Sequence, residues 1–343
     1  MNKESSIQFI CPSCRLYLVK KNNLLICDRC GKKIPTVDGV PVFTNDKYWG
    51  KVSEDELKQV IDGIDKKGFE FFDYQLQKRF DYTSHEDRAD WRFFIPITNE
   101  SKILDIGAGL GRITIPLSRI CGEVVACDKS ITRMRFLKRR AQNEKLDNVQ
   151  VVVADIFDLP FKNNSFDLIV MNGVLEWVGQ TDLFVNPRYA QIKSLEICRR
   201  LLKEGGYLYV GIENRFAHAY LKASDHNGLR FTNYMPRWLA NMYSIVRGRG
   251  PYNTYTYSKF GYTKLLHDSG FTSSQDYYLV YPGYNLPRIL VPYESINAIR
   301  YLINIHISKN NRLPRLLLWF FSTNLFIKLY RLVFYSFSIF IKK

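Results

Sequence analysis

"KILDIGAGLGR", residues 102–112, is the stretch that decides the predicted fold of this chain of 343 residues. An apolar run of strand length ends at Asp105, and glycines follow at alternate positions, Gly107, Gly109 and Gly111. A dinucleotide-binding loop has the pattern G-x-G-x-x-G after a strand, but Arg112 stands where its third glycine belongs. The loop therefore indicates that a ligand approaches the backbone closely, and it argues against a dinucleotide.

The charge beside the loop narrows the class of ligand. A carboxylate at Asp105 would repel a pyrophosphate and attract an ammonium group. A ligand with a zwitterionic amino-acid end and a nucleoside end fits better, and S-adenosylmethionine is such a ligand. Asp128 follows the glycines at about the twenty-residue spacing at which a carboxylate binds ribose hydroxyls.

Apolar runs alternate with helical stretches from residue 101 to residue 212, which predicts a sheet of parallel strands. The further runs are EVVACD, VQVVVAD, FDLIVMN and GYLYVGI. Ligands bind beyond the carboxyl ends of such strands. We expect the cofactor-binding residues to be Asp105, Gly107, Ala108, Gly109, Gly111, Asp128, Lys129, Asp155, Ile156, Asn172 and Leu175. For any single acid of this set, a helix cap or a turn residue is the alternative.

The motifs LDIGAGLGR, VVACD, VVVADIFDLPFKNNSFDLIVMNGVLEWV and LLKEGGYLYVGIENR resemble those of class I S-adenosylmethionine-dependent methyltransferases in their order and spacing. The resemblance covers residues 100–280. It implies an α/β, Rossmann-like sheet of seven strands with an antiparallel strand near one edge. It also implies an enzyme that transfers a methyl group from S-adenosylmethionine.

Four cysteines near the N-terminus form two C-x2-C pairs separated by twelve residues, namely Cys11, Cys14, Cys27 and Cys30. Each pair can offer two thiolates to one tetrahedral Zn²⁺, and Gly31 suits the positive φ of such a turn. A redox pair would not be duplicated, and disulfides are not expected in the cytosol. Because all four ligands are thiolates, we expect a structural zinc without which the unit would not fold.

The expected organisation of the chain follows from these motifs. It consists of a zinc ribbon at residues 1–46, a helical linker with the first helices of the catalytic domain at 47–100, a methyltransferase domain at 101–292 with an insertion at 213–257, and a basic amphipathic helical tail at 293–343. In the linker Phe69, Phe72, Leu76 and Phe80 have helical spacing. The first residues lack the apolar core of a secretory signal, so we expect a cytoplasmic location.

Candidate catalytic residues follow the fifth strand of the predicted sheet. A hydroxyl that accepts a methyl group benefits from a general base. Glu213 comes directly after this strand, and Asp225 and His226 lie in the insertion beyond it. For His226 the alternative is an ordinary surface or core imidazole, and Glu213 could equally accept structural hydrogen bonds.

Three classes of function remain open. Glu213, Asn214 and Arg215, followed by an Asp-His pair and a Tyr-rich segment, are similar to a stretch in methyltransferases of polysaccharide biosynthesis. This resemblance implies a saccharide or a related small-metabolite acceptor, free or lipid-linked. An RNA methyltransferase is the second reading, because the net charge is +16 and the ribbon resembles that of some ribosomal-RNA methyltransferases. A non-catalytic cofactor-binding partner of another enzyme is the third.

The C-terminal segment is apolar and basic. Residues 288–343 contain nine Lys or Arg and one acid. Its polar residues recur at helical spacing as one stripe, formed by Asn324, Lys328, Arg331, Tyr335 and Ser338. This pattern predicts that residues 315–343 form a helix that lies peripherally on the anionic inner face of a membrane. The alternative is a helix that packs on protein.

Overall fold

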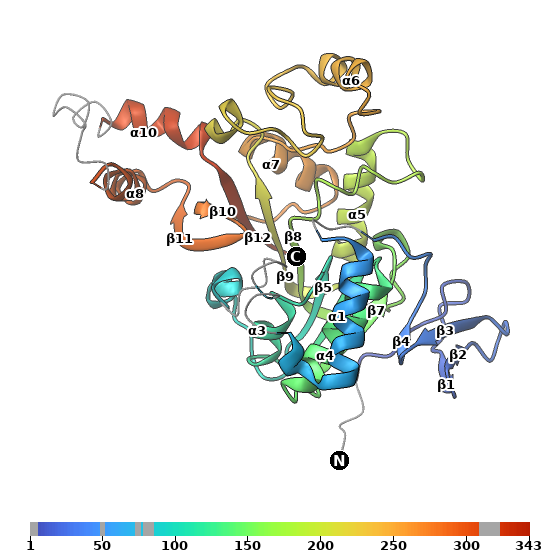
Figure 1. Ribbon diagram of the computed structural model, residues 1–343. Coiled ribbons are helices and arrows are strands. Elements are labelled where there is room, and N and C mark those ends of the chain that lie inside the picture. Colours follow the sequence, from blue (N-terminus) through green and yellow to red (C-terminus); the bar gives the residue numbers. More distant parts are fainter. Residues whose placement is uncertain (1–5, 49–51, 73–76, 78–85, 309–322) are drawn as a thin grey trace. The chain divides into compact units, whose positions relative to one another are not determined.

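The computed structural model describes residues 6–48, 52–72, 77, 86–308 and 323–343 (Figure 1). The chain divides into two compact units. The first comprises Met1–Met171, Ile197–Leu208 and Lys343, and the second comprises Asn172–Glu196 and Tyr209–Lys342. The helix expected through Leu76 and Phe80 lies outside the described residues.

The parallel sheet predicted for the first unit is confirmed. Its strands are β5 (Lys102–Ile106), β6 (Glu123–Asp128), β7 (Val149–Val153) and β8 (Phe166–Asn172). β5 pairs in parallel with both β6 and β8, and β6 pairs in parallel with β7. Ile106 lies opposite Cys127, and Asp128 lies opposite Val153. The carboxyl ends of these strands therefore meet at one edge, as the site prediction requires.

Helices cover the strands of the first unit, and two of them pack together. They are α1 (Glu54–Lys67), α3 (Thr114–Ser118) and α4 (Ile131–Asn143). α1 begins at Ser53, whose side chain accepts from the Glu56 amide while the Glu56 carboxylate accepts from the Ser53 amide. The buried side of α1 packs with Phe136 of α4, and Figure 1 shows the two helices side by side.

The N-terminal ribbon belongs to the same compact unit as the parallel strands. Its strands are β1 (Val19–Lys21), β2 (Leu24–Ile26), β3 (Lys33–Val37) and β4 (Val40–Pro41), which pair antiparallel in that order. Val40 is fully buried in a hydrophobic cluster with Leu137 and Val153. The Asp38 carboxylate accepts from Arg135 at 2.7 Å and from Arg139 at 3.1 Å, both on α4. The ribbon is thus docked on α4 by a buried contact and by ion pairs.

The second unit contains the remaining helices and strands. They are α5 (Pro187–Leu201), β9 (Leu202–Glu213), α6 (Arg237–Val246), α7 (Lys259–Asp268), β10 (Gln275–Gly283), β11 (Leu286–Pro292), α8 (Ile296–Ser308), α10 (Asn324–Tyr330) and β12 (Ser336–Lys342). The first residues of β9 and the last residues of α5 are counted with the first unit. The insertion expected at 213–257 contains α6 as its own helix.

The larger sheet has eight strands among the described residues, in the order β11-β10-β12-β9-β8-β5-β6-β7. The expected number was seven. The difference arises because residues 286–292 fold back on β10 as a hairpin, with Leu279 opposite Val291. The antiparallel strand expected near one edge is present, because β10 runs antiparallel to both β11 and β12.

The C-terminal segment corrects the prediction of one helical tail over 293–343. α8 and α10 are helices, but β12 is a strand of the sheet, in which Ile339 lies opposite Tyr277. Ser338 therefore does not belong to a helical stripe, and its hydroxyl lies 2.9 Å from that of Tyr209. In a strand buried on both faces, polar and apolar residues do not alternate. Its sequence pattern therefore cannot be distinguished from that of a hydrophobic helix. Residues 315–322 of the expected membrane helix lie outside the described residues.

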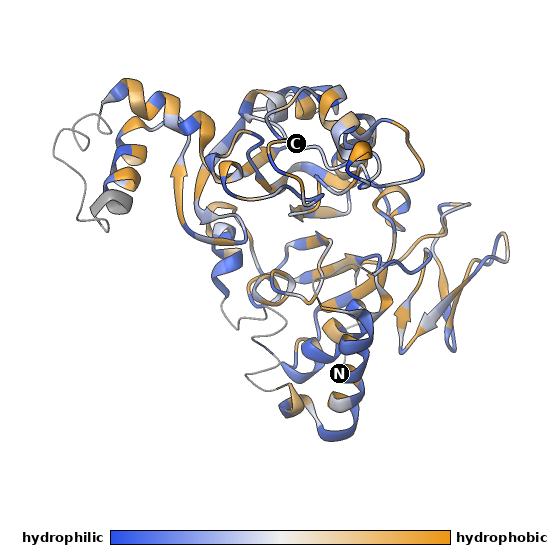
Figure 2. Cartoon of the chain, turned by 45° about the horizontal axis from the view of Figure 1, so that its top comes forward, coloured by the Kyte–Doolittle hydropathy of each residue, from blue (hydrophilic) through white to orange (hydrophobic). Residues whose placement is uncertain are grey.

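Hydrophilic and hydrophobic residues alternate along α8 and α10, as Figure 2 shows. None of the helices in the described part of the chain combines the length and the hydropathy needed to cross a membrane.

We predict that Ile339→Ala lowers the free energy of unfolding by about 2–5 kcal/mol, because Ile339 is 1% exposed and its truncation leaves a cavity. Leu325→Ala is the matched control from the same segment. Leu325 is 69% exposed on α10, so its truncation should change stability by less than about 0.5 kcal/mol. Urea denaturation of both variants measures the difference, and equal effects would contradict the assignment of β12 to the core.

Candidate functional site

The glycine loop after β5 has a backbone conformation that residues other than glycine rarely adopt. Gly107, Gly109 and Gly111 have φ values of 71°, 56° and 82°. A Cβ on Gly111 would lie 2.1 Å from Leu137 Cδ1, so this glycine lets the loop approach α4. A Cβ on Gly109 would find no protein atom closer than 3.9 Å. Gly107 is exposed, and Ala108 is half-buried. The loop therefore presents backbone to the space beyond β5, where a ligand can reach it.

Asp105, the penultimate residue of β5, is buried, with 2% of its surface exposed. Its Oδ2 accepts a hydrogen bond of 2.6 Å from the Thr114 hydroxyl. Burial raises the pKa of Asp105 to about 7, although the Thr114 hydrogen bond opposes the rise. A cationic group that arrived next to this carboxyl would favour its ionised form.

Asp128 ties the end of β6 to the glycine loop. Its Oδ2 accepts from the Gly109 amide at 3.0 Å, and its Oδ1 accepts from the Ser130 amide at 3.0 Å. Arg133 of α4 lies 3.7 Å from Oδ2. The structure thus brings Asp128 together with the loop that sequence reasoning assigned to the same ligand.

Asp155 follows β7 and caps a short 3-10 helix, Ile156–Asp158, by accepting from the Phe157 amide at 3.0 Å. Lys129 donates to its other carboxylate oxygen at 2.6 Å. The structure therefore joins two residues predicted separately for the cofactor site. The cap that was the alternative role for such an acid is present here as well.

Asn172 and Leu175 belong to the second unit. Asn172 is 7% exposed, and neither polar atom of its side chain has a hydrogen-bond partner among the described residues. The side chain of Leu175 is buried, and its carbonyl accepts from Gln191. Their contact with a cofactor stays a prediction.

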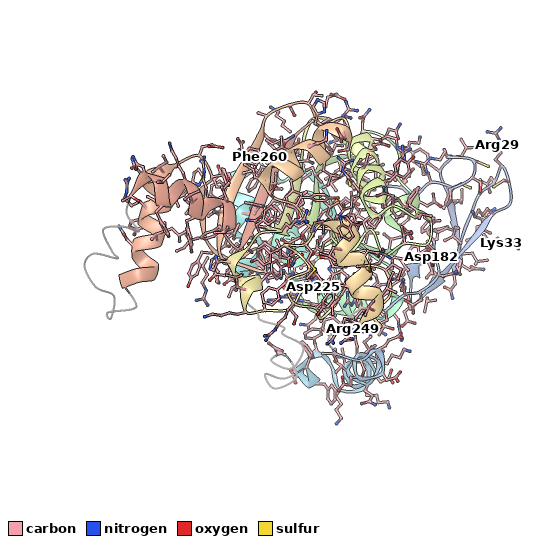
Figure 3. The ribbon with its side chains drawn as sticks, turned by 90° about the horizontal axis from the view of Figure 1, so that it is seen from above. Arg29, Lys33, Asp182, Asp225, Arg249 and Phe260 are labelled. Atoms are coloured by element: carbon pink, nitrogen blue, oxygen red, sulfur yellow. The ribbon has the colours of Figure 1, made fainter. Side chains whose placement is uncertain are left out.

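The four cysteines of the ribbon converge, with their sulfur atoms within 4.8 Å of one another. The sulfurs of Cys11 and Cys30 are 3.6 Å apart, close to the about 3.8 Å that tetrahedral zinc with 2.3 Å bonds requires. Arg15 and Gly31, with φ values of 59° and 69°, follow the two pairs, and their amides donate to the carbonyls of Cys11 and Cys27. The donor set therefore fits one zinc ion. Arg29 and Lys33 point outward from the ribbon in Figure 3.

A second cluster of polar side chains lies in the second unit, where Glu213 and His226 are brought together as predicted. His226 Nε2 lies 3.5 Å from Glu213 Oε2. Tyr284 donates to Glu213 Oε1 at 3.1 Å and to Glu176 Oε1 at 3.5 Å. The centroids of the His226 imidazole and the Trp177 indole are 4.7 Å apart. Sequence reasoning missed Glu176 and Tyr284, although a lone acid among apolar residues in VLEWV signals a buried carboxyl.

Burial and mutual charge set the protonation of this cluster. Burial, together with the charge of Glu213, raises the pKa of Glu176 to about 8. For His226 burial disfavours the imidazolium, but the interaction with Glu213 outweighs this effect and raises the pKa to about 9. At neutral pH the ligand-free cluster therefore retains protons that exposed groups would lose.

Asp225 uses its carboxylate within its own loop. Oδ1 accepts from the amides of Asn227 and Leu229 at 2.9 and 2.8 Å, and Oδ2 accepts from the Thr232 hydroxyl. These contacts fold the turn that carries His226.

The hydroxyls of Tyr252 and Tyr257 in the insertion, and of Tyr262 in α7, donate to protein groups. Tyr252 donates to Asn233 at 3.0 Å, Tyr257 donates to Gln191 at 2.9 Å, and Tyr262 donates to the Glu213 carbonyl at 3.0 Å. Arg237 lies over the rings of residues 252, 255 and 257. These observations agree with ordinary packing, the alternative to sugar recognition.

Comparison with known proteins finds relatives for part of the chain. The family model of the methyltransferase domain matches residues 104–210. The chain is 30% identical over 141 residues to a ubiquinone biosynthesis O-methyltransferase of Mesorhizobium japonicum, a match that covers 40% of this chain and 49% of the relative. It is 34% identical over 122 residues to a demethylmenaquinone methyltransferase of Clavibacter sepedonicus, covering 36% and 44%.

A protein-L-isoaspartate O-methyltransferase of Nitrobacter winogradskyi is 31% identical over 86 residues, covering 25% of this chain and 40% of the relative. The chain thus spans less than half the length of these three curated relatives. For residues 104–210 the resemblance to a methyltransferase domain that the sequence motifs indicated is confirmed.

Proposed function

We propose that this chain is an S-adenosylmethionine-dependent methyltransferase that acts on a small-metabolite acceptor. The hydrogen bond from the Gly109 amide to Asp128 carries the proposal, because it fixes an open glycine loop beside a carboxylate at the carboxyl edge of parallel strands. The match of residues 104–210 to a methyltransferase domain supports it. When bound, the cofactor supplies a methyl group that is already activated by a sulfonium, so alignment is the main task of the protein.

The residues of the first unit would divide the binding of the cofactor among them. Asp105 would face the ammonium group, and the glycine loop would leave room for the chain that bears it. Asp128 would accept hydrogen bonds from the ribose. Asp155, held by Lys129 at 2.6 Å, would read the adenine edge, with Ile156 against the ring.

In the second unit, Glu213 and His226 would activate the acceptor by withdrawing the proton of its nucleophilic group. His226 could do so only after losing its own proton, because its pKa is about 9. Asp225 is proposed as a positioning residue, because its hydrogen bonds hold the turn before His226. The four cysteines of the ribbon would hold a structural zinc ion, which their convergence within 4.8 Å supports.

A small-metabolite acceptor is favoured because one matched relative is named for ubiquinone biosynthesis and another for demethylmenaquinone. Within this class we propose a saccharide, on the resemblance of residues 212–287 to methyltransferases of polysaccharide biosynthesis. The internal hydrogen bonds of Tyr252, Tyr257 and Tyr262 leave the recognition of a sugar to other side chains.

Membrane contact is proposed for α10 alone among the described elements. Leu325 and Leu329 are 69% and 56% exposed on this helix, beside Lys328. An exposed apolar side with a neighbouring cation suits an anionic lipid surface.

We predict that Gly109→Val weakens binding of S-adenosylmethionine, because the new side chain would occupy the space in front of the loop, with its Cβ 3.9 Å from the Gly107 carbonyl oxygen, at a φ of 56° that valine rarely adopts. Gly68→Val is the matched control. Gly68 also has a positive φ, 83°, and open space around it, but it lies at the end of α1. Calorimetry should show at least a tenfold loss of affinity for Gly109→Val and no change for the control.

The same two variants test the activity. Wild type and Gly68→Val should transfer labelled methyl from S-adenosylmethionine to a glycan or lipid-linked glycan pool, and Gly109→Val should not. Label found in RNA would support the RNA methyltransferase instead, and binding without transfer to any pool would support the non-catalytic reading.

Cofactor binding is expected to release close to one proton at pH 6. Asp105, with its pKa of about 7, is mostly protonated in the free protein at that pH, and an adjacent ammonium favours the ionised form. At pH 8.5 the carboxyl is already ionised, so the release should vanish. Calorimetry in buffers of different ionisation enthalpy measures the protons, and an unchanged release in Asp105→Asn would refute the assignment.

We predict that Cys27→Ser lowers the zinc content of the purified chain by one equivalent and also lowers its melting temperature. The temperature should fall because the ribbon contributes Val40 to the core around α4. Cys121→Ala, a buried cysteine outside the ribbon, should retain the ion. Plasma mass spectrometry and thermal unfolding give the two readouts. Equal zinc content in both variants would contradict a site at these cysteines.

A further inference from the structure

We propose that Glu176, Glu213 and His226 form a binding site for one divalent transition-metal ion. All three residues lie in the second unit, on the segment after β8, at the end of β9 and in the loop before α6. No zinc ligand of the ribbon takes part, so the chain would carry two metal sites of different chemistry.

The distances between the donor atoms fit one shared ion. One donor atom from each of the three side chains lies within 4.8 Å of the other two. Glu213 Oε2 and His226 Nε2 are 3.5 Å apart. Tetrahedral coordination with bonds of about 2.1 Å separates two ligand atoms by about 3.4 Å. The Glu176 oxygen lies within 4.8 Å of both atoms, so the three side chains can together offer one face of three ligands.

Burial leaves these donor atoms without other partners. Glu176 is fully buried, and its Oε2 has no hydrogen-bond partner among the described residues. Glu213 Oε2 and His226 Nε2 have no hydrogen-bond partner among the described residues, and their only polar contact is their own ion pair at 3.5 Å. Buried carboxylate oxygens that lack donors are costly, and a cation satisfies them. The Tyr284 hydroxyl contacts Oε1 of both Glu176 and Glu213 and so orients the two carboxylates. Their Oε2 atoms are left to bind the ion.

The ligand types select the ion. Two carboxylates and one imidazole suit Mn²⁺, Fe²⁺ or Zn²⁺, whereas the four thiolates of the ribbon prefer Zn²⁺. The side chains of Glu213 and His226 are 20% and 21% exposed although their ligand atoms are buried, so an exogenous ligand would reach the ion from the side of these two residues.

The consequence for catalysis rests on the proposed function. A divalent ion lowers the pKa of a hydroxyl that contacts it, as it does for water. The acceptor O–H bond would break with its proton passing to water, the oxygen would form a bond to the methyl carbon, and the carbon–sulfur bond would break with its electron pair kept by sulfur. With the ion bound, Glu213 and His226 would act as its ligands, and this role replaces the general-base role proposed above.

The test uses Mn²⁺ with the full, zinc-loaded chain, because Mn²⁺ binds thiolates poorly and its free form has a strong paramagnetic resonance signal. Wild type should remove one equivalent of this signal. Glu176→Gln and His226→Ala should each weaken Mn²⁺ binding at least tenfold. Asp182→Asn, a change at an exposed acid of the same unit (Figure 3), should leave it unchanged.

Thermal unfolding provides a second readout that does not depend on activity. Mn²⁺ should raise the melting temperature of wild type and of Asp182→Asn, but not that of the folded variant Glu176→Gln. Absence of Mn²⁺ binding by wild type at 1 mM, or binding that survives Glu176→Gln and His226→Ala, would overturn the metal site. Neither result would bear on cofactor binding at Gly109, so the proposed function is judged separately.

Discussion

The alignment of β5 with β6 is the constraint on which the glycine loop depends. Ile106 lies opposite Cys127, so the two strands end together and Asp128 reaches the Gly109 amide at 3.0 Å. A slip of one residue would turn the Asp128 side chain to the other face of the sheet. The slip is opposed because every residue of β6 is buried, and a shifted strand would mismatch its neighbours on both faces. Packing of the strand thus holds the carboxylate at the loop.

Much of this unit could be predicted from the sequence because its signals are local. β5, β6 and β8 coincide with the apolar runs KILDI, EVVACD and FDLIVMN, since each run is bounded by loop residues and buried on both faces. The C-terminal strand could not be predicted in the same way. SFSIFIK pairs with β10, about sixty residues earlier in the chain, and its own pattern fits a greasy helix equally well. β11 pairs with β10 as a hairpin, and this pairing gives the sheet its eighth strand. Its sequence pattern did not reveal this pairing either.

The candidate sites likewise differ in whether local sequence spacing or only the fold reveals them. The cysteine pairs and the glycine loop have spacings that specify their chemistry, and both sets converge in the structure. The cluster of the second unit has no such spacing. Glu176, Glu213 and Tyr284 are separated by 37 and 71 residues, and only the fold brings their oxygens together. Asp225, which precedes His226 in the sequence, was predicted as a catalytic candidate. In the structure its carboxylate accepts hydrogen bonds from backbone amides of its own turn.

The position of the ribbon on β7 bears on how the chain resists self-association. β7 is the last strand of the sheet, and an uncovered edge of this kind exposes amides and carbonyls that can recruit a strand from another molecule. The Phe43 amide donates to the Val153 carbonyl at 2.8 Å, and Gln150 donates to the Ile7 carbonyl at 3.2 Å. The polypeptide on either side of the cysteine pairs therefore occupies that margin at two points. These segments thereby disfavour the pairing of β7 with a strand of another molecule.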